Sequence, residues 1–148
     1  MTARWALEEL LPHDHPMILI DEVDQDPEKG FYSRVRISED CPFFDVSKSG
    51  VPSWVGIEYI AQTVAAQVGL EARQAAGEVA LGYLLGSRRF EARAPYFKLG
   101  ELLTTHIDKE FQSAGLAKYS GSIYSADGAQ VVTTSLTLYS GKLEGIQQ

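Results

Sequence analysis

Residues 53–76 read SWVGIEYIAQTVAAQVGLEARQAA, and this stretch decides the fold. Apolar residues recur along it at steps of three and four, which predicts an amphipathic helix with one core-facing stripe. Ser53 can cap the first turn, and Gly77 suits the left-handed position after the last turn. The residues expected in the core-facing stripe are Trp54, Ile57, Ile60, Ala61, Val64, Ala65, Val68 and Ala72.

Two polar residues, Glu58 and Gln62, lie in the first turns of this apolar helix. They are one turn apart, so their side chains point the same way. The presence of a carboxylate on such an apolar helix needs an explanation, and a role in acid–base catalysis is one explanation. The alternative is that Glu58 is an ordinary solvated side chain on an exposed strip. Polar residues also interrupt the apolar run often enough to exclude a bilayer-spanning helix.

Length and composition favour one globular domain over residues 1–148, because no repeat, low-complexity tract or linker divides the chain. Cys41 is the single cysteine, so no intrachain disulfide can form, and a cytoplasmic location is expected. The first residues do not resemble a secretory signal. The formal charge of −7 argues against nucleic acid or an anionic membrane surface as a partner.

The remaining segments predict an α+β fold. A short opening helix is expected to end at Pro12, and alternation then predicts two strands before the long helix and four after it. Asp127-Gly128 is typical of a tight hairpin between the last two strands. One long central helix wrapped by a single curved antiparallel sheet of five to six strands is the hotdog arrangement. The strands are expected at residues 17–23, 31–37, 79–93, 102–112, 118–125 and 130–140.

The strand expected at residues 102–112 shows how the faces are assigned. Leu103, Thr105 and Ile107 alternate with polar residues and continue into Lys109 and Phe111, so all five are expected on one face. His106 falls on the polar face and is expected at the surface.

Three motifs resemble the 3-hydroxyacyl-acyl-carrier-protein dehydratases, which are hotdog enzymes. Residues 11–21, LPHDHPMILID, are similar to that family's Leu-Pro-His-x-x-Pro opening, and residues 52–62, PSWVGIEYIAQ, are similar to its Pro-Gly…Glu…Ala-Gln helix start. Residues 86–102 resemble the family's Gly…Phe…Pro…Gly-Asp-x-Leu strands. The most similar variant is the dehydratase-like protein of aryl polyene pathways.

The resemblance implies elimination of water from a 3-hydroxyacyl thioester, with Glu58 as the catalytic carboxylate. Substrate contacts are implied at Ser53, Gly56 and Gln62, with the Ser53 amide near the thioester oxygen. Ser53 could instead be a plain helix cap. Gln62 could fix the Glu58 rotamer, bind a water, or simply satisfy a backbone carbonyl.

The chain departs from the family where the usual enzymes carry a catalytic histidine, because residues 41–50, CPFFDVSKSG, contain none. One way to supply the missing base is that His13 or His15 acts in its place, oriented by Asp14 or Asp45. A second is that Glu58 works with water alone. A third is that this chain is the catalytically reduced member of a mixed dimer. His13 has a structural alternative, because an imidazole between prolines often bonds backbone groups.

Partners follow from the same resemblance. A basic group, Arg88, Arg89, Arg93 and Lys98, could bind an acidic acyl carrier protein bearing a phosphopantetheine-linked acyl chain, or be ordinary surface charge. A homodimer or heterodimer of hotdog subunits joined edge to edge is expected. The alternatives are a hotdog acyl-thioesterase and a noncatalytic acyl-binding subunit. No metal-ligand spacing is present, and the elimination needs no cofactor.

Overall fold

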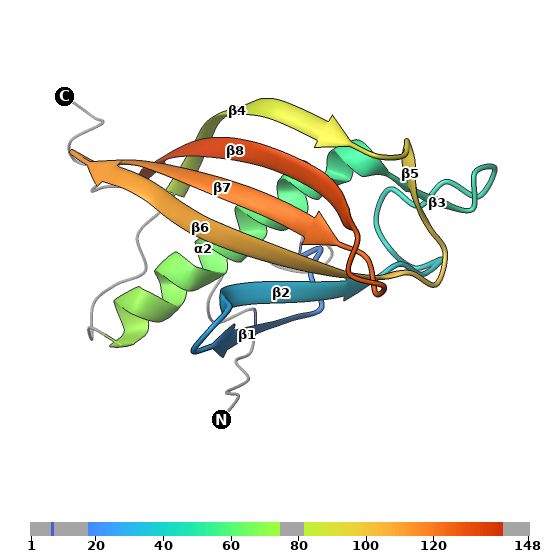
Figure 1. The fold of residues 1–148 in the computed structure, drawn as a ribbon, viewed down its shortest axis with the longest axis horizontal. Helices are drawn as coiled ribbons and strands as arrows, with labels where there is room; N and C mark the ends of the chain where they lie inside the picture. The colour runs from blue at the N-terminus through green and yellow to red at the C-terminus, as the bar shows by residue number, and fades with distance from the viewer. Residues whose placement is uncertain (1–6, 8–17, 75–81, 141–148) are drawn as a thin grey trace.

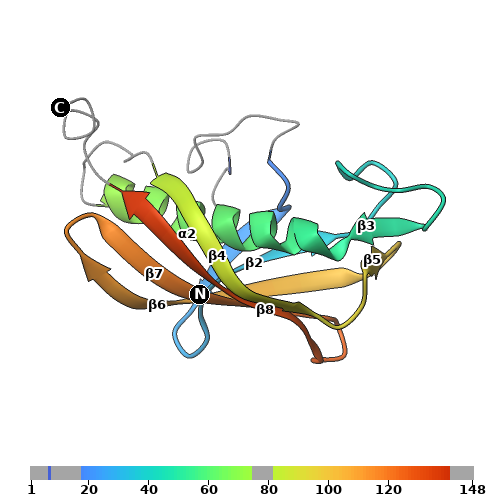
Figure 2. The ribbon, with the colours of Figure 1, turned by 90° about the horizontal axis from the view of Figure 1, so that it is seen from above.

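A computed structural model describes residue 7, residues 18–74 and residues 82–140, with backbone alone at residues 82–85 and 140. One antiparallel six-stranded sheet curves around one long helix (Figures 1 and 2). This is the predicted hotdog fold. The strand order across the sheet is β1 (Glu22–Asp26), β2 (Gly30–Arg36), β6 (Leu102–Ser113), β7 (Leu116–Tyr124), β8 (Gln130–Ser140) and β4 (Gly82–Ala92).

The helix α2 (Gly56–Gln74) lies on the concave side of the sheet, as Figure 2 shows. A 3₁₀ turn, η1 (Ser53–Val55), precedes it, and the N-cap position of this turn is held by Pro52, with no side-chain capping hydrogen bond. The prediction that Ser53 caps the helix is therefore wrong. The chain enters α2 by tightening into a 3₁₀ turn, whose short-range hydrogen bonds take the place of a side-chain cap.

The buried face of α2 differs from the predicted stripe. Ile60 and Val64 are buried as expected, but Trp54 is 55% exposed. The sheet covers a neighbouring face instead, which includes Tyr59, Thr63 and Ala66. Helix and sheet approach closely, since a methyl group added at Gly121 on β7 would overlap the Ile60 side chain. The buried residues of α2 are Gly56, Tyr59, Ile60, Gln62, Thr63, Val64, Ala66, Gly69 and Leu70.

The strand boundaries agree with the sequence at the C-terminal end and differ at the N-terminal end. The strand predicted at residues 130–140 is β8, and Gly128 takes the positive φ of 88° that its hairpin turn requires. Residues 18–20 are buried but form no strand, because the ladder with β2 begins at Glu22. Leu7 is helical and buried, and the rest of the predicted opening helix lies outside the described residues.

The face predicted along β6 is right for its first half. Leu103, Thr105 and Ile107 point into the core, but Lys109 and Phe111 are exposed. Every residue from Asp108 to Ser113 is exposed, so this end of β6 has no buried face, and a register shift between Lys109 and Phe111 interrupts the ladder with β7 there. Sequence alternation alone does not reveal such a bulge.

The last strands do not form a simple meander. β6, β7 and β8 follow one another, but β4 pairs with β8 at the far edge. Within the described residues no strand lies on the other side of β4, so its outer backbone groups are unpaired (Figure 1). Two short strands, β3 (Gly50–Pro52) and β5 (Tyr96–Lys98), pair beside the front of α2. No helix in the described ranges is long and apolar enough to cross a bilayer.

Candidate functional site

Glu58 is half-buried in the first turn of α2, and its side chain is tied to Gln62 one turn later. Gln62 is 1% exposed. Its Nε2 donates to Oε1 of Glu58 over 3.3 Å, and its Oε1 accepts the backbone amide of Leu19 over 2.8 Å. The bond to Glu58 is the contact that a role in fixing the Glu58 rotamer requires.

The Leu19 hydrogen bond decides how the Gln62 amide is oriented. A backbone N–H can only donate, so the amide oxygen must face Leu19 and the NH₂ group must face Glu58. The site thus joins a carboxylate, a buried amide and the segment that follows the proline-bounded histidines. His13 and His15 themselves lie outside the described residues, so their roles stay predictions.

The front of α2 rests on a buried polar and aromatic layer. Thr63 donates to the Tyr59 carbonyl over 2.7 Å, and its hydroxyl lies 2.7 Å from that of Ser33 on β2. The Tyr59 ring stacks on Phe97 of β5 with centroids 5.9 Å apart, and burial raises the pKa of Tyr59. These contacts hold the first turns of α2 in place, and with them the Glu58 backbone.

Ser53 does not offer the amide that the sequence predicted. Its backbone N–H donates to the Pro95 carbonyl over 2.8 Å, so the expectation that this amide faces a thioester oxygen is wrong. The Gly56 amide is likewise used within the 3₁₀ turn, where it donates to the Ser53 carbonyl. Gly56 has a packing role, because an added Cβ there would press on Ile123 and Phe97.

Asp45 holds its own loop together. Its Oδ1 accepts the Ser47 amide over 2.9 Å and the Ser47 hydroxyl over 2.7 Å. The Ser47 hydroxyl lowers the pKa of Asp45, and backbone donors from Ser47 and Lys48 add to this effect. The carboxylate therefore shapes residues 45–50, and the idea that it orients a histidine finds no support in these contacts.

His106 lies on the outer, polar face of the sheet, as the sequence predicted, but it is only partly exposed there. It is half-buried on the convex side of the sheet, with its ring centroid 5.3 Å from that of Tyr32 and 5.5 Å from that of Tyr124. Burial lowers the pKa of His106. It lines a groove of about 730 Å³ that does not include Glu58. Its cross-strand position opposite Tyr32 gives it a stacking role that alternation alone could not show.

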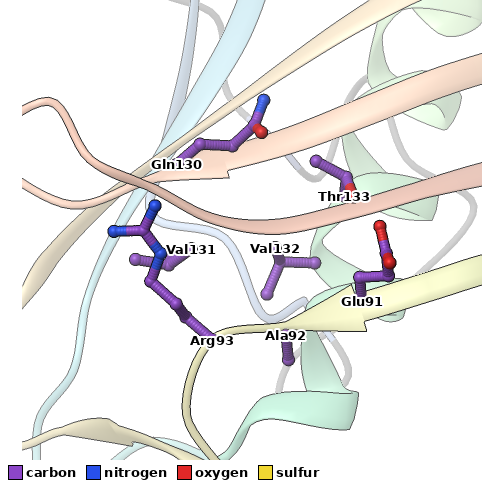
Figure 3. A pocket seen from close by; sticks show the side chains of 7 residues that line it. All are labelled: Glu91, Ala92, Arg93, Gln130, Val131, Val132 and Thr133. Atoms are coloured by element: carbon purple, nitrogen blue, oxygen red, sulfur yellow. The ribbon is translucent and has the colours of Figure 1, made fainter.

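The predicted basic group follows the open edge of the sheet. Arg88 and Arg89 lie on β4, Arg93 follows it, and Lys98 ends β5; all four are exposed. Arg93 and Glu91 flank a pocket of about 290 Å³ between β4 and β8, with the Arg93 guanidinium on the Gln130 side (Figure 3). Arg88, Arg89 and Arg93 thus lie on or just after an edge strand of the six-stranded sheet, whereas Lys98 lies on the separate two-stranded sheet.

The sequence did not predict an aromatic pair that lies near Glu58 along the chain. The rings of Phe43 and Trp54 meet edge to face with centroids 5.4 Å apart, yet the two residues are 52% and 55% exposed. The sequence feature that could have indicated this pair is an apolar residue, Phe43, in a loop that is otherwise rich in turn-forming residues. In the described part of the chain, no cluster of three metal-ligating side chains occurs.

Comparison with known proteins gives one family and one fold. The ApeP-like family, described as ApeP dehydratase, matches residues 5–148. The structure is similar to one titled "The Dehydratase Heterocomplex ApeI:P from Xenorhabdus doucetiae", with 28% identity and a TM-score of 0.86 over 97% of this chain and 96% of that one. Comparison with curated proteins gives no match.

More distant structures share the fold alone. The smu.793 protein of Streptococcus mutans UA159, solved bound to acetyl CoA, is 13% identical with a TM-score of 0.60 over 87% of this chain and 96% of that chain. A hypothetical thioesterase from Streptococcus pneumoniae TIGR4, solved with coenzyme A, is 12% identical with a TM-score of 0.57 over 75% of this chain and 77% of that chain.

Proposed function

Because the chain belongs to the ApeP-like dehydratase family, we propose that it removes water from 3-hydroxyacyl thioesters carried on an acyl carrier protein, as one subunit of a hotdog dimer. The observation that carries the proposal is the carboxyl group of Glu58, held by the buried Gln62 at the front of the central helix. The family motif includes Glu58, and its bond to Gln62 supports assigning it as the catalytic carboxylate.

The reaction needs two proton transfers, and Glu58 is suited to one of them. A base removes the proton alpha to the thioester carbonyl, and the electron pair forms the new double bond as the beta-hydroxyl leaves. Glu58 gives its proton to that hydroxyl, which departs as water. The hydrogen bond from Gln62 restricts the Glu58 rotamer, so the carboxyl group is oriented before the substrate arrives.

This chain's own candidates for the base are His13 and His15. They precede Leu19, whose amide is bound to Gln62 one turn from Glu58. His15 precedes Leu19 by four residues in the sequence, and this closeness along the chain supports assigning one of these two histidines as the base.

A second arrangement has support of its own. The structurally similar ApeI:P protein is titled a heterocomplex, and the outer edge of β4 has no strand partner among the described residues. A second hotdog subunit pairing at this edge would extend the sheet and could bring the base, with this chain supplying Glu58. The carrier protein would dock on the basic group formed by Arg88, Arg89, Arg93 and Lys98.

The test is mass spectrometry of a 3-hydroxyacyl carrier protein incubated with this chain, alone and together with a second hotdog subunit. Loss of water supports the proposal, and a requirement for the second subunit supports the mixed dimer. Loss of the acyl group would instead indicate a thioesterase. No change under either condition would indicate a noncatalytic acyl-binding subunit.

A further inference from the structure

A groove of about 730 Å³ lies on the convex face of the sheet, on the side away from α2 and Glu58. Outward-facing residues of β2, β6 and β7 make its floor. The β1–β2 turn and the β7–β8 turn form its walls, and Figure 2 shows both turns below the sheet, opposite α2. A groove of this volume is large enough for a small molecule. It is separate from the Glu58 site, so the proposed dehydration does not use it.

Three aromatic rings form a row across the floor of this groove. Tyr32, His106 and Tyr124 come from neighbouring strands, and the ring centroids are 5.3 Å apart for the first pair and 5.5 Å apart for the second. At one end of the row the chain supplies its own cation, because the guanidinium carbon of Arg34 lies 5.0 Å from the Tyr32 centroid. The face of an aromatic ring attracts cations. In the described part of the chain, no cation lies over the Tyr124 ring at the other end.

The charged side chains of the groove favour a cation over an anion. Arg34 is neutralised by Glu22, whose Oε1 accepts its Nη1 over 2.6 Å, and its Nη2 donates to the Tyr32 hydroxyl over 3.0 Å. Lys29 attracts the Asp26 carboxylate of the same turn. The other two carboxylates, Glu28 and Asp108, form no ion pair with a described residue. The charged residues that line the groove are Asp26, Glu28, Lys29, Arg34 and Asp108.

The positions of these two carboxylates favour an extended ligand with more than one positive group. Glu28 belongs to the β1–β2 turn, whereas Asp108 lies on β6. Apolar side chains, Leu102 and Ala126, also line the groove. A hydrated metal ion makes no use of a ring face or of apolar side chains. A linear polyamine uses both, because its ammonium groups pair with carboxylates and rings while its methylene groups pack on apolar surface.

We propose that the convex groove is a binding site for a linear polyamine, with one ammonium group over the Tyr124 ring and others beside Glu28 and Asp108. His106 meets Tyr124 edge to face and holds that ring in the row. The site is noncatalytic, and it goes beyond the proposed function because its ligand and its face of the sheet are different.

Isothermal titration of the full-length chain with spermidine at low ionic strength tests the site. We expect one spermidine to bind per chain, with an affinity that falls as NaCl screens the charges. Glu28→Gln and Asp108→Asn should each raise the Kd about two- to fivefold, as loss of an exposed ion pair does, and about tenfold when combined. Both side chains are exposed, so circular dichroism should show an unchanged fold.

Substitutions of Tyr124 test the ring face separately from charge. Tyr124→Leu removes the aromatic face and should raise the Kd about threefold, whereas Tyr124→Phe keeps the face and should bind as the unsubstituted chain does. The hydroxyl that phenylalanine lacks accepts a bond of 3.3 Å from the exposed Gln130. Equal weakening by the two substitutions would show that the ring face is not used, and would overturn the inference.

The double variant Asp40→Asn with Glu71→Gln is the matched control. It removes the same charge from exposed positions that do not line the groove, and Glu71 lies on α2 across the sheet. Its Kd is expected to stay within about twofold of the unsubstituted value. Equal weakening in this control, or no saturable binding to the unsubstituted chain, would overturn the inference. So would complete displacement of spermidine by an equal concentration of Mg²⁺. No acyl substrate takes part, so either result leaves the dehydratase proposal to its own test.

Discussion

Gln62 lies with its Nε2 3.3 Å from Oε1 of Glu58, and the same side chain receives the Leu19 amide over 2.8 Å. One buried amide therefore connects the helix carboxylate to the segment that follows His13 and His15. The Leu19 bond fixes which end of the amide faces Glu58, and we propose that Gln62 positions the Glu58 carboxyl group.

Replacing Gln62 by glutamate tests this positioning. Gln62→Glu removes the donor and sets two carboxylates one turn apart, so we expect turnover to fall about a hundredfold. The like charge should also raise the pKa of the carboxylate pair, which moves the pH–rate profile to higher pH. Gln67→Glu, at a half-buried position on the same helix, is the control and should keep both rate and profile. An unshifted profile for Gln62→Glu would remove the positioning role.

Glu58→Gln should abolish dehydration while leaving the fold intact. The glutamine side chain can still accept the bond from Gln62, but it carries no proton to give to the leaving hydroxyl. Single-turnover assays with a 3-hydroxyacyl carrier protein measure the loss, and circular dichroism checks the fold. The exposed Glu71 on the same helix supplies the control, Glu71→Gln, which should retain full activity. Full activity in Glu58→Gln would exclude Glu58 from the mechanism.

Substitution of the histidines identifies the base. We expect His13→Ala or His15→Ala to lower turnover about a hundredfold or more, as loss of an acid–base group does. His106→Gln is the control, because His106 stacks between tyrosines on the convex side of the sheet. If both alanine variants remain fully active, neither histidine is the base, and the second subunit must be examined for it.

Gly121→Ala should destabilise the chain. The new methyl group would overlap Ile60 Cγ2, and overpacking of this kind costs about 1–3 kcal/mol. Urea unfolding followed by circular dichroism measures the difference. Gly86→Ala is the comparison, since nothing lies within 4 Å of a Cβ added there. Equal stability of the two variants would show that the helix can move away from the sheet without cost.

Acidification should weaken the fold through His106. Burial lowers the pKa of His106 below 6.5, so the folded state favours the neutral ring. This contribution to stability is complete above pH 6.5 and is lost as the pH falls through the lowered pKa. We expect the unfolding midpoint of the unsubstituted chain to drop more between pH 7.5 and 5.5 than that of His106→Gln. Parallel pH profiles for the two proteins would contradict this.

Much of the fold could be predicted from the sequence, because its helix and strands follow regular patterns of apolar and polar residues. Alternation predicted a strand at residues 31–37, and β2 spans Gly30–Arg36. Asp127-Gly128 predicted the last hairpin, whose turn takes a positive φ at Gly128. The bulge near Phe111 and the exposure of Trp54 were missed, because both depend on what pairs or packs from elsewhere in the chain.

At the site, the sequence pointed to Glu58 and Gln62 through their one-turn spacing, but it could not show the third member. The Leu19 amide lies 43 positions from Gln62 along the chain. Every residue except proline has a backbone N–H, so a sequence motif cannot indicate which one donates the bond. The sequence also assigned the Ser53 amide to a ligand, whereas the Pro95 carbonyl receives it.

The sequence alone determined the helix and the alternating strands and indicated a candidate carboxylate, because periodicity and residue type are local properties. Tertiary structure alone decided which helix face meets the sheet, which strand forms its open edge and where each amide donates its hydrogen. Those choices depend on close approach at glycines such as Gly121 and on hydrogen bonds between distant segments, which form only after the chain has folded back on itself.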